Sequence, residues 1–331
     1  MPVVKYASLF AGIGGFDLGF DRAGMTPTAQ VEINPNSAKV LAEHWPDVPR
    51  GEDIRDVSGS DIGRPDVVAA GFPCKDLTVR KTGGRAGLAG KDSALYWEFH
   101  RLVDEHLRLV DATRPRWTVL ENVEGLLTSN AGRDLAAVLL GLENLGYGWA
   151  YRLVNSRDVG SAQRRKRVVV VGHRGGDPRP AWEVLADRPS SAGSADVRGE
   201  SPGGQRPELR PGADEGVRVY RRRANARATA ALGGYHAYEA ATFYNTLASS
   251  DGPAPTMQKH LIEQHGRLRG LTPVEAERLQ GFPDEWTAPA AFSARWKALG
   301  DAMNVDLAHW LGRRLVETTE AIPMLTTPLM R

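Results

Sequence analysis

The sequence predicts an α/β protein with a doubly wound core and a smaller, mostly β or irregular second domain. The first third alternates short β-branched runs with helical patterns, which is typical of βαβ units in a parallel sheet. A glycine-rich turn joins the first such run to a helical pattern, and the composition changes after residue 173. The 331 residues are enough for one large and one smaller domain, each with its own core.

Hydrophobic patterns place the elements of the core in chain order. Strands are expected where β-branched and apolar residues form short runs, at residues 3–10, 28–32, 66–71, 117–121, 150–155 and 168–172. Helices are expected where apolar residues recur at helical spacing, at residues 16–23, 36–44, 95–110 and 135–145. Because the two kinds of element alternate, we expect a parallel sheet covered by helices on both faces.

The second domain is predicted between residues 174 and 270. Residues 174–216 are rich in Gly, Pro, Ser and Ala without a clear period, and residues 217–270 hold shorter β-like pieces and many arginines. Helical patterns return at residues 272–280, which begin with a threonine cap, a proline and an acidic residue, and at residues 304–318. The apolar face of the last pattern should pack on the first domain, which therefore comprises residues 1–173 and 271–331.

The composition excludes several classes of protein. Forty-two Lys plus Arg against 40 Asp plus Glu give a net charge of +2, too little to wrap nucleic acid by bulk charge, although a local basic groove is compatible with it. Cys74 is the single cysteine, which excludes an internal disulfide and makes a thiolate metal site implausible. No stretch approaches the roughly 18 apolar residues of a membrane span, and the first residues lack a secretory signal. We expect a cytoplasmic protein that uses neither metal nor membrane.

The turn at residues 10–15, Phe-Ala-Gly-Ile-Gly-Gly, follows a predicted strand and opens a helix. Its glycines permit a tight turn and let a ligand approach backbone N–H groups, so a nucleotide is plausible. No Gly-Lys-Ser/Thr follows, which argues against a triphosphate. Glu32 lies about 20 residues farther on, where an acidic side chain commonly accepts hydrogen bonds from ribose hydroxyls. Asp53 follows the expected third strand and could accept from an adenine amino group, although a solvated Glu32 and a turn-capping Asp53 are equally compatible with the spacing.

Cys74 lies just past the carboxyl end of a predicted buried strand, which is the edge where open α/β sheets assemble their sites. A lone cysteine is most often a small buried hydrophobe. Here it follows a proline and precedes a loop rich in Lys, Arg and Gly, so we expect exposed and cationic surroundings. Such surroundings lower a thiol pKa and make the thiolate available as a nucleophile.

Five blocks of sequence occur in a characteristic order. They are residues 10–15, 71–74 (Gly-Phe-Pro-Cys), 121–123 (Glu-Asn-Val), 163–167 (Gln-Arg-Arg-Lys-Arg) and 278–283 (Arg-Leu-Gln-Gly-Phe-Pro). In order and approximate spacing they resemble the cytosine-C5 DNA methyltransferases, and the resemblance covers residues 8–172 and 271–315. It implies a Rossmann-like methyltransferase core and a target-recognition domain at residues 174–270, the segment that reads the DNA sequence in this family.

The resemblance implies methyl transfer from S-adenosylmethionine to C5 of cytosine in a specific double-stranded DNA sequence, leaving S-adenosylhomocysteine. Cytosine C5 is a weak nucleophile, so Cys74 would first add to C6 of a base swung out of the duplex. Glu121 matches the residue that holds a proton at N3, and Arg165 is taken to match the arginine that reaches O2. From the residues alone, Glu121 could instead cap a turn, and Arg165 could contact solvent or phosphate.

The resemblance also assigns binding residues. The cofactor is expected at Phe10, Gly12, Gly14, Gly15, Glu32, Asp53, Ile54, Pro73, Leu95, Asp301 and Asn304. DNA is expected at Lys75, Arg80, Lys81, Arg85, Gln163, Arg221, Arg222 and Arg223. The basic, glycine-rich loop after Cys74 is expected to close over the base. The implied enzyme acts as a monomer, and a cognate restriction endonuclease acting separately is compatible with the sequence.

Three positions depart from the family pattern. Lys75 stands where the family usually has Gln, and Thr78 stands where it usually has Ser. Asp301 replaces an Asn that helps to hold the methionine end of the cofactor, and its carboxylate would repel that of the cofactor. Asn304 or a nearby arginine could compensate, Asp301 could be protonated, or cofactor binding could be weakened; we favour compensation. Two alternatives stay open, a tRNA cytosine-5 methyltransferase and a catalytically impaired DNA-binding relative.

Overall fold

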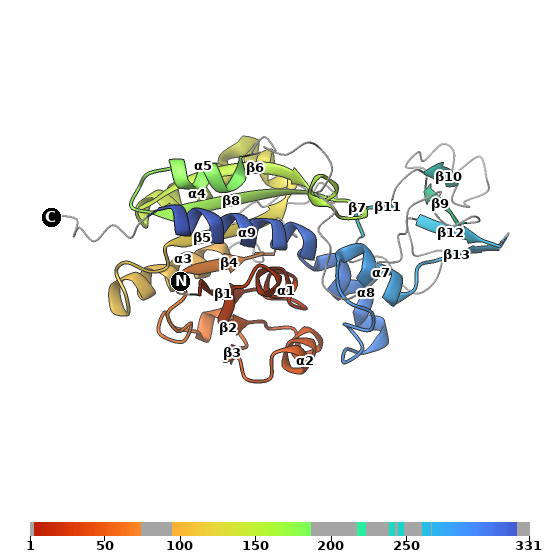
Figure 1. Ribbon diagram of the computed structural model, residues 1–331, viewed down its shortest axis with the longest axis horizontal. Coiled ribbons are helices and arrows are strands. Elements are labelled where there is room, and N and C mark those ends of the chain that lie inside the picture. Colours follow the sequence, from red (N-terminus) through yellow and green to blue (C-terminus); the bar gives the residue numbers. More distant parts are fainter. Residues whose placement is uncertain are drawn as a thin grey trace.

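The computed structural model describes residues 3–73, 95–186, 217–222, 238–241, 244–247, 260–265 and 267–322. Within them, seven strands form one sheet in the order β3-β2-β1-β4-β5-β8-β6 (Figure 1). In that order the strands are Arg50–Gly51, Thr26–Val31, Lys5–Leu9, Val67–Ala70, Trp117–Val123, Lys166–Arg174 and Tyr147–Asn155. The first five run parallel to one another, as the βαβ pattern predicted.

The last pair of strands differs from the expected parallel arrangement. Strand β8 runs antiparallel to both β5 and β6. Only the 3-10 helix η5 (Ser156–Val159) and the two-residue strand β7 (Gln163–Arg164) connect β6 to β8. A parallel neighbour needs a crossover of a dozen or more residues, usually a helix, so this short connection produces an antiparallel pair. The amino end of β8 therefore lies at the same edge as the carboxyl ends of β4 and β5.

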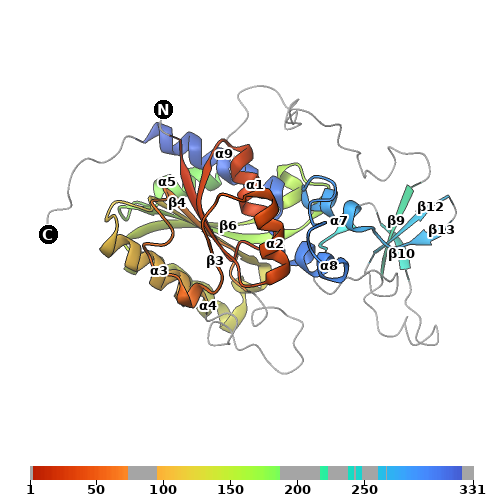
Figure 2. The same ribbon diagram turned by 90° about the horizontal axis from the view of Figure 1, so that it is seen from below.

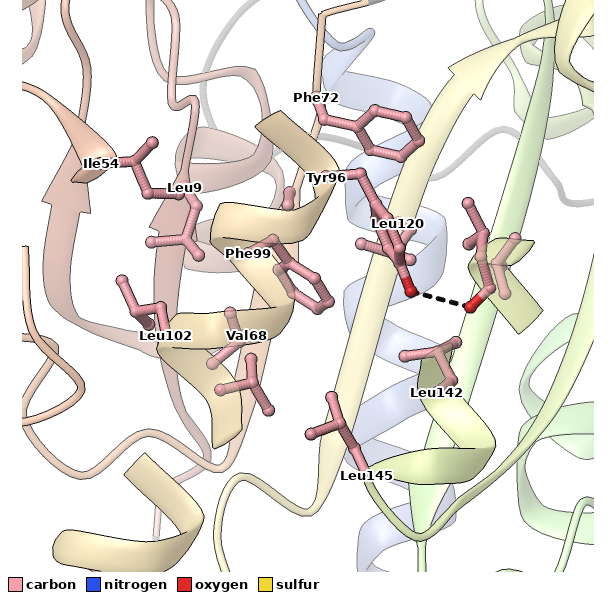
Figure 3. Close-up of a cluster of buried hydrophobic side chains, with 14 of the residues drawn as sticks. Leu9, Ile54, Val68, Phe72, Tyr96, Phe99, Leu102, Leu120, Leu142 and Leu145 are labelled. Atoms are coloured by element: carbon pink, nitrogen blue, oxygen red, sulfur yellow. Dashed lines mark hydrogen bonds between the residues drawn. The ribbon is translucent and has the colours of Figure 1, made fainter. Parts of the chain in front are cut away.

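Two groups of helices cover the faces of this sheet. Helices α3 (Leu95–Leu109) and α4 (Arg133–Asn144) pack on one face, where Tyr96 donates a hydrogen bond to the carbonyl of Val138 at 2.8 Å. Figure 3 shows Phe72, Tyr96 and Phe99 within this cluster. On the other face, α1 (Gly15–Arg22), α5 (Arg179–Leu185) and α9 (Val305–Ala321) bury their apolar sides. The sheet is thus covered on both faces, which confirms the doubly wound core.

Helix α2 (Pro35–His44) packs with α7 (Pro273–Gln280) and α8 (Phe292–Asp301) in a third apolar cluster beside the glycine-rich turn (Figure 2). The predicted capping box of α7 is present, since Thr272 accepts from the Glu275 backbone and the Glu275 carboxylate accepts from the Thr272 backbone. The side chain of Asn304 caps α9. The predicted core strands and helices are confirmed, with ends that differ by at most three residues.

Helix α5 lies in the segment that the sequence assigned to the second domain. It nevertheless packs on the first sheet, where Ala181, Val184 and Leu185 join the same apolar cluster as α9. The chain thus continues to cover the large sheet as far as residue 186. The composition changes at residue 174, but the packing on the large sheet ends about a dozen residues later, after α5.

A second, four-stranded antiparallel sheet lies at one end of the molecule (Figures 1 and 2). Its order is β10-β9-β12-β13, comprising Tyr238–Ala241, Val217–Arg222, His260–Gln264 and Arg267–Arg269. Strand β11 (Tyr244–Asn245) pairs instead with β7 of the core. Short 3-10 helices η1 (Ile54–Asp56), η3 (Glu124–Leu127) and η4 (Ser129–Gly132) follow β3 and β5. Among the described residues, no helix has the length and apolar character to cross a membrane.

Candidate active site

The glycine-rich turn leaves β1 and enters α1 in a conformation that its residues constrain. Phe10, Gly12 and Gly14 all adopt positive φ angles, 56°, 58° and 83°. A Cβ on Gly14 would lie 2.5 Å from the Trp45 ring, and one on Gly15 would lie 2.2 Å from the carbonyl oxygen of Met303. A Cβ on Gly12 would meet nothing within 4 Å. Gly14 and Gly15 are therefore needed for packing, whereas Gly12 faces open space that a ligand can enter.

Two tryptophans hold this turn in place, and no sequence signal pointed to either. The Nε1 of Trp286 donates to the carbonyl of Ile13 at 2.8 Å, and Trp286 stacks on His44 with ring centroids 3.4 Å apart. Trp45 packs against Gly14 and donates to Asp21 at 2.7 Å. The turn is thus fixed before any ligand binds. Phe10 has a left-handed conformation that is strained for a bulky residue, as is common at functional sites.

Glu32 lies directly beside the open part of the turn. Its carboxylate accepts from the backbone N–H of Gly12 at 2.7 Å and from that of Asn34 at 2.7 Å. Burial raises the pKa of Glu32, and these two hydrogen bonds oppose the shift. The next residue, Ile33, is 63% exposed and follows β2 at the same edge of the sheet. Ile33 is a residue that the sequence analysis missed.

Asp53 has the turn-capping role that the sequence left open. Its side chain accepts from the backbone N–H of Arg55 at 3.0 Å and pairs with the Arg55 guanidinium. That pairing lowers the pKa of Asp53 to about 2. Ile54 and Leu95 pack against the apolar cluster under α3, Ile54 being buried and Leu95 partly buried. Asp53 remains at the sheet edge that carries Glu32, but its carboxylate already has a partner.

Glu121 lies beside the residues that precede the cysteine. A Cβ on Gly71 would be 3.5 Å from Oε2 of Glu121, and the Asn122 amide donates to the carbonyl of Phe72 at 3.1 Å. The parallel pairing of β4 with β5 places Ala70 opposite Leu120 and so brings the two motifs together. Pro73 is the last described residue of this segment. Cys74, Lys75, Arg80, Lys81 and Arg85 lie outside the described residues.

The arginine that meets Glu121 is Arg167. Its Nε lies 2.7 Å from Oε1 of Glu121, and both side chains are about one-tenth exposed (10% and 11%). Val169 pairs with Glu121 across β5 and β8, so residue 167, two positions earlier, shares the face of that carboxylate. Strand alternation alone gives residues 165 and 167 the same face, so the sequence pattern did not distinguish the two arginines.

Arg165 has a different position from the one predicted. Its guanidinium is buried and donates to the carbonyls of Leu247 (3.3 Å), Gly300 (3.2 Å) and Ala302 (2.8 Å). It precedes β8 and is drawn toward the turn between α8 and α9 instead of the face that carries Glu121. The position of Arg165 therefore does not support the expected contact with the base, and Arg167 is the arginine that faces Glu121.

Gln163 is also part of the framework. Its side chain is fully buried, accepts from the backbone of Leu247 at 2.8 Å and donates to Leu279 at 3.3 Å. These contacts use the amide group that was expected to contact DNA, so that expectation is not retained. Arg221 and Arg222 belong to β9 of the small sheet, and Arg223 lies outside the described residues.

The two C-terminal positions expected at the cofactor behave differently from each other. Asn304 is buried, caps α9 by accepting from Leu307 at 3.1 Å, and donates to Ser161 at 3.1 Å. Asp301 is exposed and pairs with Lys297, whose Nζ lies 2.5 Å from Oδ2. The partner of the Asp301 carboxylate is thus Lys297, whereas the expected compensation was by Asn304 or an arginine. No sequence signal pointed to Lys297.

The fold and this edge define a Rossmann-like methyltransferase core, with a glycine turn and an acidic residue on one side and a buried carboxylate beside a Gly-Phe-Pro motif on the other. The chain belongs to the C-5 cytosine-specific DNA methylase family, whose profile matches residues 4–317. It is a DNA cytosine-5 methyltransferase. The family, the fold class and the enzyme class predicted from the sequence are thereby confirmed.

Two curated relatives cover nearly all of the chain. The Type II methyltransferase M2.BsuMI of Bacillus subtilis is 31% identical over 330 residues, 96% of this chain and 77% of that protein. The Type II methyltransferase M.NlaX of Neisseria lactamica is 30% identical over 327 residues, 96% of this chain and 98% of that protein. Among solved structures, Dnmt2 of S. pombe superposes with a TM-score of 0.60 at 16% identity, covering 96% of this chain and 99% of that one. At this identity the superposition shows the fold alone.

Proposed function

We propose that this methyltransferase uses S-adenosylmethionine and acts on cytosine in a specific double-stranded DNA sequence, through a covalent bond between Cys74 and C6 of an extruded base. The observation that carries the proposal is the Glu121–Arg167 pair. It is buried at the carboxyl edge of β4 and β5, beside the three residues that lead to Cys74. A charged pair of this kind, in a water-poor position next to a nucleophile, is suited to stabilise charge on a heterocycle.

The electron flow determines what each side chain does. The Cys74 thiolate forms the S–C6 bond, and the ring electrons move toward N3, where a proton taken up with the base and held between N3 and the Glu121 carboxylate neutralises them. C5 then has the electron density to form its bond to the methyl group that S-adenosylmethionine supplies when bound. Water accepts the C5 proton, the electrons of that C–H bond expel the Cys74 sulfur as thiolate, and the N3 proton is released past Glu121, which restores the aromatic ring. Arg167 holds Glu121 in place, and its planar fork has further N–H groups that can donate to O2 of the base.

The residues around the glycine turn fit a nucleoside. Gly12 faces open space, Glu32 lies beside it with a carboxylate for the ribose hydroxyls, and the exposed Ile33 offers an apolar surface for an adenine ring. We assign the same cofactor site to the other residues that the sequence suggested for it, which are Phe10, Gly14, Gly15, Pro73 and Leu95. We propose that the cofactor binds here, and that Asp53, if it contacts the adenine, does so while paired with Arg55.

The named relatives are Type II methyltransferases, which supports a role in protecting DNA from a restriction endonuclease that acts separately. We assign recognition of the target sequence to the part of residues 174–270 that follows α5, which includes the four-stranded sheet. The extrusion of the base costs a few kcal/mol, which contacts in the pocket must offset.

The test is expression of the gene in a bacterial host without DNA methylation, followed by sequencing of the host genome for 5-methylcytosine. We expect 5-methylcytosine at one short sequence with the wild-type gene and none with Cys74→Ala. Methylation spread without sequence preference would contradict the assignment of sequence specificity. Modified tRNA with unmodified DNA would instead support the RNA alternative.

A further inference from the structure

The side chain of Trp286 reaches the glycine turn from the segment between α7 and α8. Its Nε1 donates to the carbonyl of Ile13 at 2.8 Å, across 273 positions of sequence. Ile13 directly follows Gly12, the residue that faces open space. The N–H of Gly12 donates to Glu32 at 2.7 Å. The open part of the turn is therefore held on one side by the strand that carries Glu32 and on the other by an indole from a distant segment.

The residues on both sides of Trp286 are held by a buried ion pair. Glu277 of α7 and Arg295 of α8 lie 2.8 Å apart, and their side chains are 0% and 10% exposed. The Glu277 carboxylate also accepts from the backbone N–H of Thr287 at 2.9 Å. Arg295 also pairs with Glu285 at 3.0 Å. Buried ion pairs often add little to stability compared with apolar residues, so this pair is better explained by the loop that it fixes.

Aromatic rings fix the orientation of the indole. The ring of Trp286 stacks on His44 with centroids 3.4 Å apart and meets the ring of Trp45 edge-on at 5.5 Å. A ring nitrogen of His44 also lies 3.0 Å from the carbonyl oxygen of Trp286. The side chain of Trp286 is only 7% exposed. Packing and hydrogen bonds of the protein itself thus aim the indole N–H at the glycine turn.

The glycine turn needs such a contact because its backbone is strained. Phe10 and Gly12 have φ angles of 56° and 58°. Strained backbone persists only where the surrounding contacts over-determine it. If the turn could relax, ligand binding would have to restore the competent conformation, and the apparent affinity would fall with the fraction of molecules in that conformation.

We propose that Trp286 is a positioning residue for the cofactor. Its N–H holds the Ile13 carbonyl, and with it the open space at Gly12, in the conformation that binds the nucleoside. This inference rests on the proposed cofactor and adds a residue that acts through the backbone of the turn. Trp286 then sets how tightly the cofactor binds and leaves the rate of methyl transfer on the bound base unchanged.

The experiment compares two variants of the full-length protein by calorimetric titration with S-adenosylhomocysteine. Trp286→Phe keeps an aromatic ring and removes the N–H. Trp296→Phe is the matched control, since Trp296 is 2% exposed in the same apolar cluster and its Nε1 has no hydrogen-bond partner among the described residues. The same ring atoms are lost in both, so their stabilities should fall similarly. Trp286→Phe should raise Kd about tenfold, and Trp296→Phe should leave it within about twofold of wild type.

Steady-state methyl transfer separates positioning from chemistry. In Trp286→Phe, KM for S-adenosylmethionine should rise about tenfold, while kcat and KM for DNA stay within about twofold of wild type. Benzothienylalanine at position 286 is the second variant, because it keeps the size of the indole and has sulfur in place of the N–H. It should weaken binding to the same extent without leaving a cavity.

Unchanged Kd in both position-286 variants, or equal losses of affinity in Trp286→Phe and Trp296→Phe, would overturn the inference, because the ring would then only fill the cluster. A lower kcat with an unchanged KM for S-adenosylmethionine would overturn it as well. These results are distinct from failure of the proposed cofactor. If S-adenosylhomocysteine does not bind the wild-type protein, while the protein is folded by circular dichroism, the cofactor proposal itself is wrong.

Discussion

The glycines of the turn after β1 differ in what a side chain would meet. Gly15→Ala places a Cβ 2.2 Å from the carbonyl oxygen of Met303, a backbone atom that cannot move aside cheaply. We expect a loss of about 2–3 kcal/mol in the free energy of unfolding. Gly12→Ala meets no atom and should cost only about 1 kcal/mol for its left-handed backbone, while blocking the ligand space. Urea unfolding followed by tryptophan fluorescence compares them; greater destabilisation by Gly12→Ala would contradict this ranking.

Asp17 is a buried carboxyl group in the first turn of α1. It accepts hydrogen bonds from Ser8 at 2.9 Å and from Gln30 at 2.9 Å. Burial raises the pKa of Asp17 from 3.8 to about 6, although the two hydrogen bonds lower it. Because the folded-state pKa is the higher one, the stability that this proton contributes is complete below about pH 4 and is lost as the pH rises through about 6.

The raised pKa of Asp17 predicts how the free energy of unfolding of Asp17→Asn, relative to wild type, depends on pH. The amide resembles the protonated acid and does not ionise, so the variant should gain stability relative to wild type as the pH rises from 4 to 8. The linkage relation sets the gain at up to about 3 kcal/mol. Urea unfolding at several pH values measures the difference. A difference that stays constant between pH 4 and 8 would show that Asp17 does not titrate in this range.

Among single substitutions, one at Arg167 should affect the rate of methyl transfer most directly, because Arg167 pairs with Glu121. Arg167→Lys keeps the charge but loses the planar fork that meets Glu121, so kcat should fall about 100-fold. Lys166→Met is the control on the same strand. Lys166 is exposed, and its Nζ pairs with the exposed Glu124 at 3.5 Å instead of with Glu121. Radiolabelled methyl transfer to DNA measures both. Equal activity of Arg167→Lys and the control would remove Arg167 from the site.

At the scale of elements, apolar residues at helical spacing identified most of the helices, and a start signal supported one of them. The threonine, proline and acidic residue at the start of residues 272–280 predicted α7, and the apolar pattern of residues 304–318 predicted α9, which the structure shows to be capped by Asn304. Helices α5 and α8 begin after Pro178 and Ala291, neither of which makes a side-chain cap, and both were missed. Missing α8 also hid the Lys297–Asp301 pair, which is apparent only at helical spacing.

Arg165, between β7 and β8, links this part of the core to the turn between α8 and α9. The carbonyls of Leu247, Gly300 and Ala302 all accept from the buried guanidinium of Arg165. Arg165→Met would remove this shared donor. We expect a loss of about 3 kcal/mol in the free energy of unfolding. The neighbouring Arg164 is exposed, and Arg164→Met should change stability by less than about 0.5 kcal/mol. Thermal unfolding of the two variants tests this; similar losses would contradict a framework role specific to Arg165.

Over the whole molecule, the site assembles because strand ends converge at one edge of the sheet. Carboxyl ends of β1, β2, β4 and β5 bring the glycine turn, Glu32, Gly71–Pro73 and Glu121 together, and sequence order predicted that convergence. The antiparallel β8 brings its amino end, with Arg167, to the same edge. A sequence pattern alone does not give the direction or the first residue of β8, which is why Arg165, and not Arg167, was expected at the base.

The central claim is that Cys74 forms a bond to the base beside the Glu121–Arg167 pair. DNA carrying 5-fluorocytosine at the methylated position tests it most directly, since fluorine cannot leave as the C5 proton does and the adduct persists. With S-adenosylmethionine, the wild-type enzyme should give a protein–DNA adduct that survives denaturing electrophoresis, with the attachment mapped to Cys74 by mass spectrometry. Cys74→Ser should give none; methylation of ordinary DNA by Cys74→Ala, or an adduct at another residue, would contradict the account.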